Sequence, residues 1–267
     1  MKSQASSNSK EKFKRLSEIF KRAPKSPSPS ITSDNNENYN FLSDPPLTPL
    51  QLNGYKSSTK HQLLSLPLAE ELRFHLPPRL QISHDWQLLY SIEQNGISLR
   101  TLYNSMIPKD TFRSRKFGYL LVIRDENHQL FGCYVNEYLR PMDKKRYYGN
   151  GECFLWKTEI SRIPNLNNLT NTNINNNNSD DDLESTISSS HEQMRLKVFP
   201  YTSLNDFIIY SNHDFISIGS GDGKFGLWID SDLYKGASDS VQTFGNEPLS
   251  SHVQFKILGL EVWQLGD

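Results

Sequence analysis

The chain has 267 residues, with 29 basic and 30 acidic side chains and a formal net charge of −1. This length accommodates one domain of about 170–200 residues together with flexible parts. The near-neutral charge argues against nucleic acid as the main partner. No stretch approaches the ~18 consecutive apolar residues of a membrane-spanning helix, so we expect a soluble chain without an integral membrane segment.

The start of the chain differs in composition from the rest. Residues 1–40 are rich in Ser, Lys and Asn, and residues 45–60 read as an extended, proline-containing linker. Such a sequence buries too little apolar surface to offset the entropy that ordering removes. We therefore expect a disordered tail and linker over residues 1–60, followed by one folded domain over residues 61–267.

One segment of the tail, Glu11–Arg22, has the spacing of an amphipathic helix with a basic opposite face. Such a helix docks on a partner protein, lies on an anionic membrane or directs a protein to an organelle, and the sequence leaves these roles open. Glu11 and Glu18 argue against mitochondrial targeting, because transit peptides contain few acids. The apolar residues of the face are Phe13, Leu16, Ile19 and Phe20.

Three hydroxyl residues of the tail and linker directly precede proline, which is the minimal pattern of proline-directed kinases. They are Ser26, Ser28 and Thr48. Each is a candidate for phosphorylation. A two-residue pattern is common by chance, so it does not by itself assign a role.

Three helices are predicted before the sheet begins. Pro67–Leu76 places leucines at positions i and i+4, has a proline in its first turn and ends at a proline pair. Asp85–Glu93 is predicted as a second helix, which an Asn-Gly pair closes. Ser98 is expected to cap a third helix, whose apolar residues continue to Tyr103.

From Tyr119 the pattern changes to that of strands. Tyr119–Arg124 and Leu130–Tyr134 are aromatic and branched, and turn residues separate them, so they predict a β-hairpin. Cys153–Trp156 predicts a further strand. Residues 164–193 contain Asn, Ser, Thr and acids with almost no apolar side chains. We expect them to form a disordered insertion that leaves the core, because the entropic cost of closing a loop grows slowly with its length.

A glycine-rich turn joins two of the remaining predicted strands. Its glycines, Gly219, Gly221 and Gly223, reach the positive φ angles that tight turns need. The apolar residues of the last strand switch parity near Gly259, which predicts either two covered faces or a β-bulge. The remaining strands are Phe207–Tyr210, Phe215–Ile218, Phe225–Ile229 and Phe255–Leu265. Strands in succession after a few helices predict an α+β, mostly β, antiparallel domain.

The glycine-rich run matches the dinucleotide-binding pattern by its letters alone. That site needs a helix N-terminus facing the pyrophosphate, and here a strand is predicted to follow. The seven histidines are scattered, and none has a His or Cys partner at the spacing of metal ligands. We therefore expect no cofactor and no metal ion.

The two cysteines, Cys133 and Cys153, carry the serious enzymatic hypothesis, which is direct scavenging of peroxide by a thiol. Reactive thiols are accessible and have a lowered pKa. Both cysteines lie in apolar, strand-like runs without a basic neighbour, so we expect buried, reduced thiols. Glu152 could be a catalytic acid, but a lone carboxylate in a strand is more often a hydrogen-bonding or interface residue. No constellation specifies a reaction, and we expect no enzyme.

Several stretches, in one order, carry a family resemblance. They are Ser91–Tyr103, Gly118–Asp125, Phe131-Gly132, Gly149–Trp156, Tyr201-Thr202, Ile216–Asp230, Gly236–Ser238, Thr243–Asn246 and Leu260–Trp263. Together they resemble the TLDc domain of the oxidation resistance proteins, and the short fungal members most of all. The resemblance covers roughly Leu63 to Leu265, and it implies a two-sheet antiparallel sandwich with short flanking helices.

The resemblance also implies a function. Similar proteins bind the peripheral catalytic sector of the vacuolar proton-pumping ATPase and promote or maintain its disassembly, so that oxidation resistance is indirect. It implies a location in the cytoplasm and at the vacuole surface, while the basic amphipathic segment keeps the mitochondrion as an alternative. We expect a monomer. The residues to test for partner contact are Phe13, Leu16, Ile19, Phe20, Glu152, Gly219, Gly221 and Gly223.

Overall fold

The computed structural model describes residues 47–108, 117–144, 146–164 and 190–266 of the chain. The predicted amphipathic segment of the tail and residues 165–189 of the predicted insertion lie outside the described residues. Among the described helices, none is long and apolar enough to cross a membrane.

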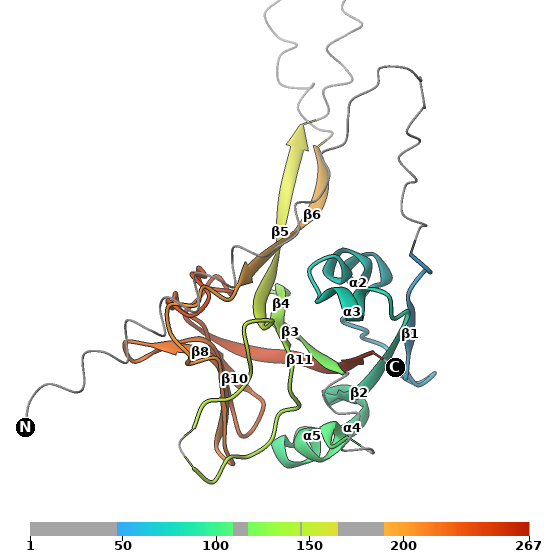
Figure 1. The fold of residues 1–267 in the computed structure, drawn as a ribbon. Helices are drawn as coiled ribbons and strands as arrows, with labels where there is room; N and C mark the ends of the chain where they lie inside the picture. Colours follow the sequence, from blue (N-terminus) through green and yellow to red (C-terminus); the bar gives the residue numbers. More distant parts are fainter. Residues whose placement is uncertain (1–46, 109–116, 145, 165–189, 267) are drawn as a thin grey trace, which may run out of the picture. The chain divides into compact units, whose positions relative to one another are not determined.

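The described part of the chain is mostly β, with short helices beside the strands, as predicted (Figure 1). The helices are α2 (Leu66–Arg73), α3 (Pro78–Gln81), α4 (Ile92–Asn95) and α5 (Leu99–Met106). The strands are β1 (Gln51–Asn53), β2 (Asp85–Ser91), β3 (Gly118–Asp125), β4 (Leu130–Val135), β5 (Phe154–Pro164), β6 (Ser190–Pro200), β7 (Ile209–Ser211), β8 (Phe215–Gly221), β9 (Lys224–Asp230), β10 (Lys235–Ala237) and β11 (Gln254–Leu265).

Helices α2 and α5 begin where the sequence predicts, because a serine caps each of them. The Ser65 hydroxyl accepts a hydrogen bond from the Leu68 amide at 3.4 Å, and a proline occupies the first turn of α2. The Ser98 hydroxyl accepts from the Thr101 amide at 3.2 Å. Each serine therefore satisfies an amide that the helix leaves without a partner.

The helix predicted over Asp85–Glu93 is wrong. Residues 85–91 form strand β2, which pairs in parallel with β1 and antiparallel with β11. The side chains of Trp86, Leu88 and Tyr90 alternate inward along this strand. The same stretch also has apolar residues at helical spacing, so local periodicity does not decide between the two structures. Pairing with two distant strands decides it, and only the short helix α4 follows.

Most of the strands form one path of paired neighbours, in the order β6-β5-β4-β3-β11-β10-β9-β8-β7, and β1 and β2 branch from it at β11. The predicted hairpins β3–β4 and β8–β9 are both present. Strand β11 connects the two halves, because residues 254–256 pair with β10 and residues 257–265 pair with β3. Two separate sheets, the detail that the resemblance implied, are therefore not confirmed. The register shifts between Ile257 and Gly259, which is the β-bulge alternative, and Leu260–Trp263 are all buried, so that both faces are covered beyond it.

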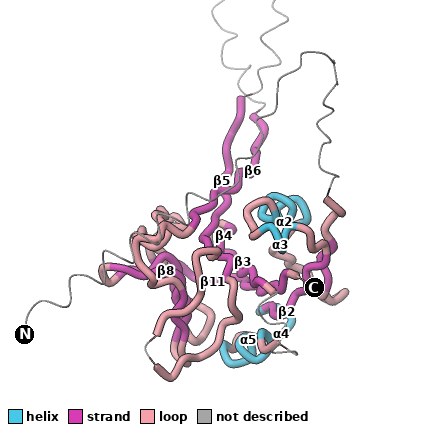
Figure 2. The backbone as a smooth tube through the Cα atoms, in the orientation of Figure 1, coloured by secondary structure: helices cyan, strands magenta, loops and turns pink. Residues whose placement is uncertain are grey.

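Strand β3 is buried on both faces, and it separates two apolar cores. On one face, Leu121 and Ile123 pack with residues of β8, β9 and helix α5. On the other face, Leu120 and Val122 pack with residues of β2 and helices α2 and α3. Figure 2 shows the two groups of helices, in cyan, apart from one another beside the strands. A strand buried on both faces reads as a continuous apolar run, and Tyr119–Ile123 has that sequence.

Strands β5 and β6 form a hairpin that extends beyond the neighbouring strands (Figure 1). Its outer part corrects the bounds of the predicted insertion, since Ser190–Gln193 pair with Ser161–Pro164. These residues have few apolar side chains, and periodicity therefore gave no signal. Backbone pairing continues outward from the buried part of the hairpin.

The carboxylate of Glu261 is a buried acceptor that joins the beginning of the domain to its last strand. It accepts hydrogen bonds from the Leu63 and Leu64 amides at 3.0 and 3.3 Å. The Tyr55 hydroxyl and the Trp263 indole N–H also donate to it, at 2.8 and 3.0 Å. Burial raises the pKa of Glu261, and these four donors act in the opposite direction by favouring the ionised form.

We expect the substitution Glu261→Gln to lower the free energy of unfolding by about 2–3 kcal/mol. The glutamine NH2 group would replace one accepting oxygen, so that buried N–H and O–H donors would lose their acceptor. Urea unfolding at pH 7, followed by tryptophan fluorescence, measures this loss. The control is Glu71→Gln on the exposed face of α2, for which we expect a change within about 0.5 kcal/mol. Equal values for the two variants would contradict the role of Glu261.

Candidate functional site

The predicted glycine turn is present between β8 and β9, and its geometry explains its residues. Asp222 and Gly223 form a two-residue turn, in which φ is 52° at Asp222 and 75° at Gly223. Gly221 and Lys224 pair across the turn. Two consecutive positive φ angles are the reason that Asp-Gly is favoured in such hairpins. Gly223 is exposed at the tip, where a Cβ atom would meet no other atom within 4 Å.

The three predicted glycines have different surroundings. Gly219 is buried with φ of 74°, and a Cβ atom there would lie 2.7 Å from a ring carbon of Phe244. Gly221 has ordinary backbone angles, and the nearest atom to its Cβ position is 4.0 Å away on Asn205. Gly219 is therefore needed by the fold, whereas Gly221 and Gly223 lie where a partner has access.

Glu152 lies in the turn before β5 and forms a two-contact ion pair with Arg79 of helix α3. One contact joins Arg79 Nη1 to Glu152 Oε1, and the other joins Nη2 to Oε2 at 2.6 Å. The Glu152 amide donates to the side chain of Asn150 at 2.9 Å. Hydrogen bonding to Glu152 raises the pKa of Arg79 further. Glu152 is thus a paired surface residue, and its geometry resembles a contact site more than a proton-transfer site.

The Arg79–Glu152 pair borders a hollow of about 650 Å³, which we call the polar hollow. The residues that line it are Arg79, Asn136, Glu137, Tyr138, Arg140, Asn150 and Glu152.

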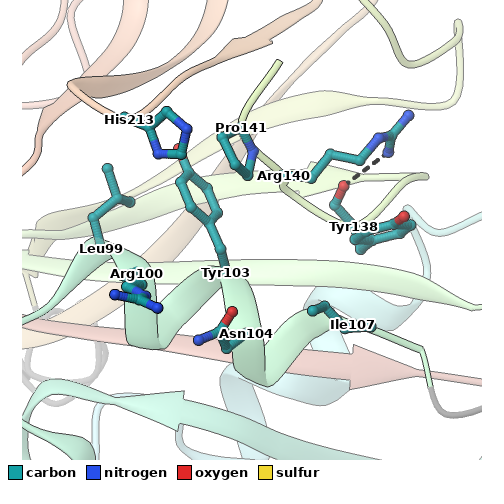
Figure 3. A pocket seen from close by; sticks show the side chains of 9 residues that line it. All are labelled: Leu99, Arg100, Tyr103, Asn104, Ile107, Tyr138, Arg140, Pro141 and His213. Carbon is teal, nitrogen blue, oxygen red and sulfur yellow. Dashed lines mark hydrogen bonds between the residues drawn. The ribbon is translucent and has the colours of Figure 1, made fainter. Parts of the chain in front are cut away.

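A second hollow, of about 580 Å³, lies beside helix α5, and we call it the apolar hollow (Figure 3). Ile107 and Pro141 give it apolar walls, while Arg100 and His213 stand at its edge. Arg100 is exposed and forms no ion pair with another described residue. The residues that line the apolar hollow are Leu99, Arg100, Tyr103, Asn104, Ile107, Tyr138, Arg140, Pro141 and His213.

Tyr138 and Arg140 line both hollows, so the loop after β4 forms a ridge between them. Arg140 donates to the Glu137 carboxylate at 2.8 Å and to the Tyr138 carbonyl at 3.1 Å. Its guanidinium also lies over the rings of Tyr138 and Tyr148, 4.8 and 4.5 Å from their centroids. These contacts hold the ridge in one conformation. A fixed ridge with an apolar hollow on one side and a polar hollow on the other is suited to binding a protein surface.

Of the predicted contact residues that the structure describes, only Glu152 lines one of these hollows. The glycine turn lines neither of them, and the apolar residues Phe13, Leu16, Ile19 and Phe20 lie outside the described residues. Sequence reasoning missed Arg79, Tyr138 and Arg140. Arg79 and Glu152 are 73 positions apart in the sequence, and no local pattern connects them.

Both thiols are buried, as predicted, and neither forms a disulfide. Burial raises the pKa of Cys153 to about 12 and that of Cys133 well above its usual range. The Cys153 thiol donates a hydrogen bond to the side-chain oxygen of Asn136 at 3.1 Å. Among the described residues, no group of His, Cys, Asp and Glu side chains is arranged to hold a metal ion. The thiols therefore have the opposite properties from those of a peroxide-reactive cysteine.

Comparison with known proteins gives one consistent result. Residues 57–266 match the TLDc domain. The chain is 46% identical over 258 residues to oxidation resistance protein 1 of Debaryomyces hansenii, covering 83% of this chain and 76% of that protein. It is 42% identical to oxidation resistance protein 1 of Kluyveromyces lactis, covering 88% of both chains. It is 41% identical to the protein of that name in Saccharomyces cerevisiae, covering 82% and 79%.

We expect Gly219→Ala to lower the free energy of unfolding by about 2–4 kcal/mol, because it adds left-handed backbone strain to a clash with Phe244. Gly221→Ala is the matched control, and we expect it to stay within about 1 kcal/mol of the parent. Denaturant titration of the three proteins checks both values. A Gly219→Ala protein of unchanged stability would show that this glycine is not required by the fold.

We expect both thiols of the folded chain to react slowly with a disulfide reagent at pH 8 and rapidly in urea. With a pKa of about 12 for Cys153, only about one molecule in ten thousand carries that thiolate at pH 8. Absorbance of the released thiol measures the two rates, and single Cys→Ser variants assign them. A native thiol that reacts within seconds would restore the peroxide-scavenging hypothesis.

Proposed function

Because the chain belongs to the TLDc domain family, we propose that it is a regulator of the vacuolar proton-pumping ATPase. In this proposal it binds the peripheral catalytic sector of that enzyme, promotes or maintains disassembly and catalyses no reaction itself. Its similarity to several oxidation resistance proteins adds a role in resistance to oxidative stress, which we propose to be indirect.

One observation carries the proposal beyond the similarity, and it is the fixed ridge between the apolar and polar hollows. Tyr138 and Arg140 present an aromatic ring and a guanidinium, the two kinds of group that are enriched at the centres of protein interfaces. Ile107, 58% exposed, adds an apolar contact beside them. This surface offers binding groups rather than a nucleophile and a base.

The runner-up function is direct peroxide scavenging by Cys133 or Cys153. It requires an accessible thiolate at neutral pH. The burial of both side chains and the raised pKa values act against it. A regulatory role needs neither thiol.

A protein that keeps two sectors of an enzyme apart must bind the detached sector more tightly than the assembled one. The folded domain provides a rigid contact, and we propose that the tail residues Phe13, Leu16, Ile19 and Phe20 provide a second one. Linking two contacts in one chain raises the effective concentration of the second. We propose a monomer that acts in the cytoplasm and at the vacuole surface, with the mitochondrion as the alternative location.

The test is a titration of the full chain against the purified, detached peripheral sector, with complex formation followed by mass photometry and ATP hydrolysis measured in parallel. We expect a stoichiometric complex, with a Kd raised at least about fivefold by Ile107→Ser in the apolar hollow. The matched control is Ile82→Ser, which changes an isoleucine that is 71% exposed and lines neither hollow.

The three outcomes of this titration are distinct. Absence of a complex at micromolar concentration would overturn the ATPase proposal. A complex that both substitutions weaken equally, or that neither weakens, would keep the partner and reject the ridge as the contact. A chain that lacks residues 1–22 measures the contribution of the tail in the same assay.

A further inference from the structure

The segment Leu47–Asn53, which we call the strap, enters the domain through an exposed threonine. Thr48 and Pro49 are exposed, whereas the next residue, Leu50, is buried in the core beside helix α2. The strap then forms β1 and pairs with β2. Thr48 is thus an exposed hydroxyl residue before proline, two positions before the buried Leu50.

The carbonyl of Thr48 is bound by Arg73, a fully buried arginine of helix α2. Arg73 Nη1 donates to that carbonyl at 2.7 Å, and Nε donates to the carbonyl of Gln81 at 2.5 Å. Nη1 also lies 3.4 Å from Oε2 of Glu70. The second amino group, Nη2, has no hydrogen-bond partner among the described residues.

The surroundings of Arg73 leave its charge incompletely compensated. A guanidinium has five N–H donors, and burying such a cation is unfavourable unless anionic acceptors satisfy it. The nearest carboxylate, that of Glu70, is 34% exposed and also accepts the Leu50 amide at 2.7 Å. Arg73, which contacts the Thr48 carbonyl, therefore still has N–H groups that can donate to a further anionic acceptor.

We propose that Thr48 is a phosphorylation site and that Arg73 binds its phosphate. A proline-directed kinase transfers the γ-phosphoryl group of ATP to Thr48 Oγ. The bond from Oγ to phosphorus forms, the bond from phosphorus to the ADP oxygen breaks, and the hydroxyl proton passes to the kinase base. The phosphate carries about −1.5 to −2 charge at pH 7 and three acceptor oxygens, and arginine binds such groups through two parallel N–H contacts.

The geometry of the strap makes this assignment specific. The Thr48 carbonyl already lies 2.7 Å from Nη1, and the Oγ atom belongs to the same residue. A phosphate on Oγ thus belongs to the residue that Arg73 already contacts, and we propose that it reaches the guanidinium by rotation of the Thr48 side chain. The kinase reaches the site by local release of the strap, because β1 has three residues with no buried side chain.

The consequence is a modification that fastens the strap. The strap leads directly to Tyr55, whose hydroxyl binds Glu261 of the last strand. A phosphate that joins Thr48 to Arg73 therefore fixes the point where the tail leaves the domain. This inference does not depend on the ATPase proposal.

In the experiment, phosphothreonine is genetically encoded at position 48 of the full chain. The phosphate contact is then tested independently of whether a kinase can reach Thr48. Phosphorus NMR follows the second pKa of the phosphate in the native chain and in urea. We expect the native value to be lower by at least about half a unit, because the guanidinium favours the dianion. We also expect the melting temperature to rise by about 2–4 °C. Equal pKa values in the two states, or a lowered melting temperature, would overturn the proposed contact.

Two further arms assign the result. The substitution Arg73→Lys keeps the positive charge but removes the planar guanidinium. With it, we expect most of the difference between the native and unfolded pKa values of the phosphate to disappear. If that variant fails to fold, the comparison of native and unfolded states in the parent still decides the contact. The kinase arm uses a Ser26→Ala, Ser28→Ala chain and mass spectrometry, with Thr48→Val as control. Phosphate at Thr48 supports the modification, and its absence after prolonged incubation with proline-directed kinases overturns it.

Discussion

The hydrogen bonds to Glu261 join the first segment of the domain to its last strand. Through them, one carboxylate on the last strand gathers a tyrosine and two amides from the segment that precedes helix α2. An ionised carboxylate in the interior is unfavourable by itself, and these donors make it tolerable. The arrangement fixes the N-terminal segment on the face of the sheet that α2 and α3 cover. The polar hollow depends on this packing, because Arg79 reaches Glu152 from helix α3.

The chemical groups of the chain are divided between the inside and the outside in a way that bears on function. The thiols lie inside, where burial keeps them protonated. The outside carries the ridge of Tyr138 and Arg140, which several contacts immobilise. A rigid surface loses little conformational entropy on binding. A buried pair of thiols and an immobilised outer ridge are the features that we expect of the partner-binding domain proposed above.

Local chemistry in the sequence was sufficient for several elements. The glycine-rich turn between β8 and β9 and the Ser98 cap of α5 follow from the conformations that these residues favour. The prediction for residues 85–91 was wrong, because their apolar residues fit both the helical and the strand periodicity. Pairing with β1 and β11 makes this segment a strand. The hollows could not be predicted from the sequence either, because the fold, and not their spacing in the sequence, brings Arg79, Tyr138 and Glu152 together.

Strand β11 follows in the sequence all the strands with which it pairs, and this order has a consequence for biosynthesis. Strands β2, β3 and β10 are all made before the strand that they share. Until it emerges from the ribosome, β2 and β3 have open edges, and the apolar faces that later pack on Trp263 lack that side chain. Exposed edges of this kind invite pairing with other chains. Until β11 is synthesised, the nascent protein therefore exposes strand edges and apolar surface of the kind that chaperones bind.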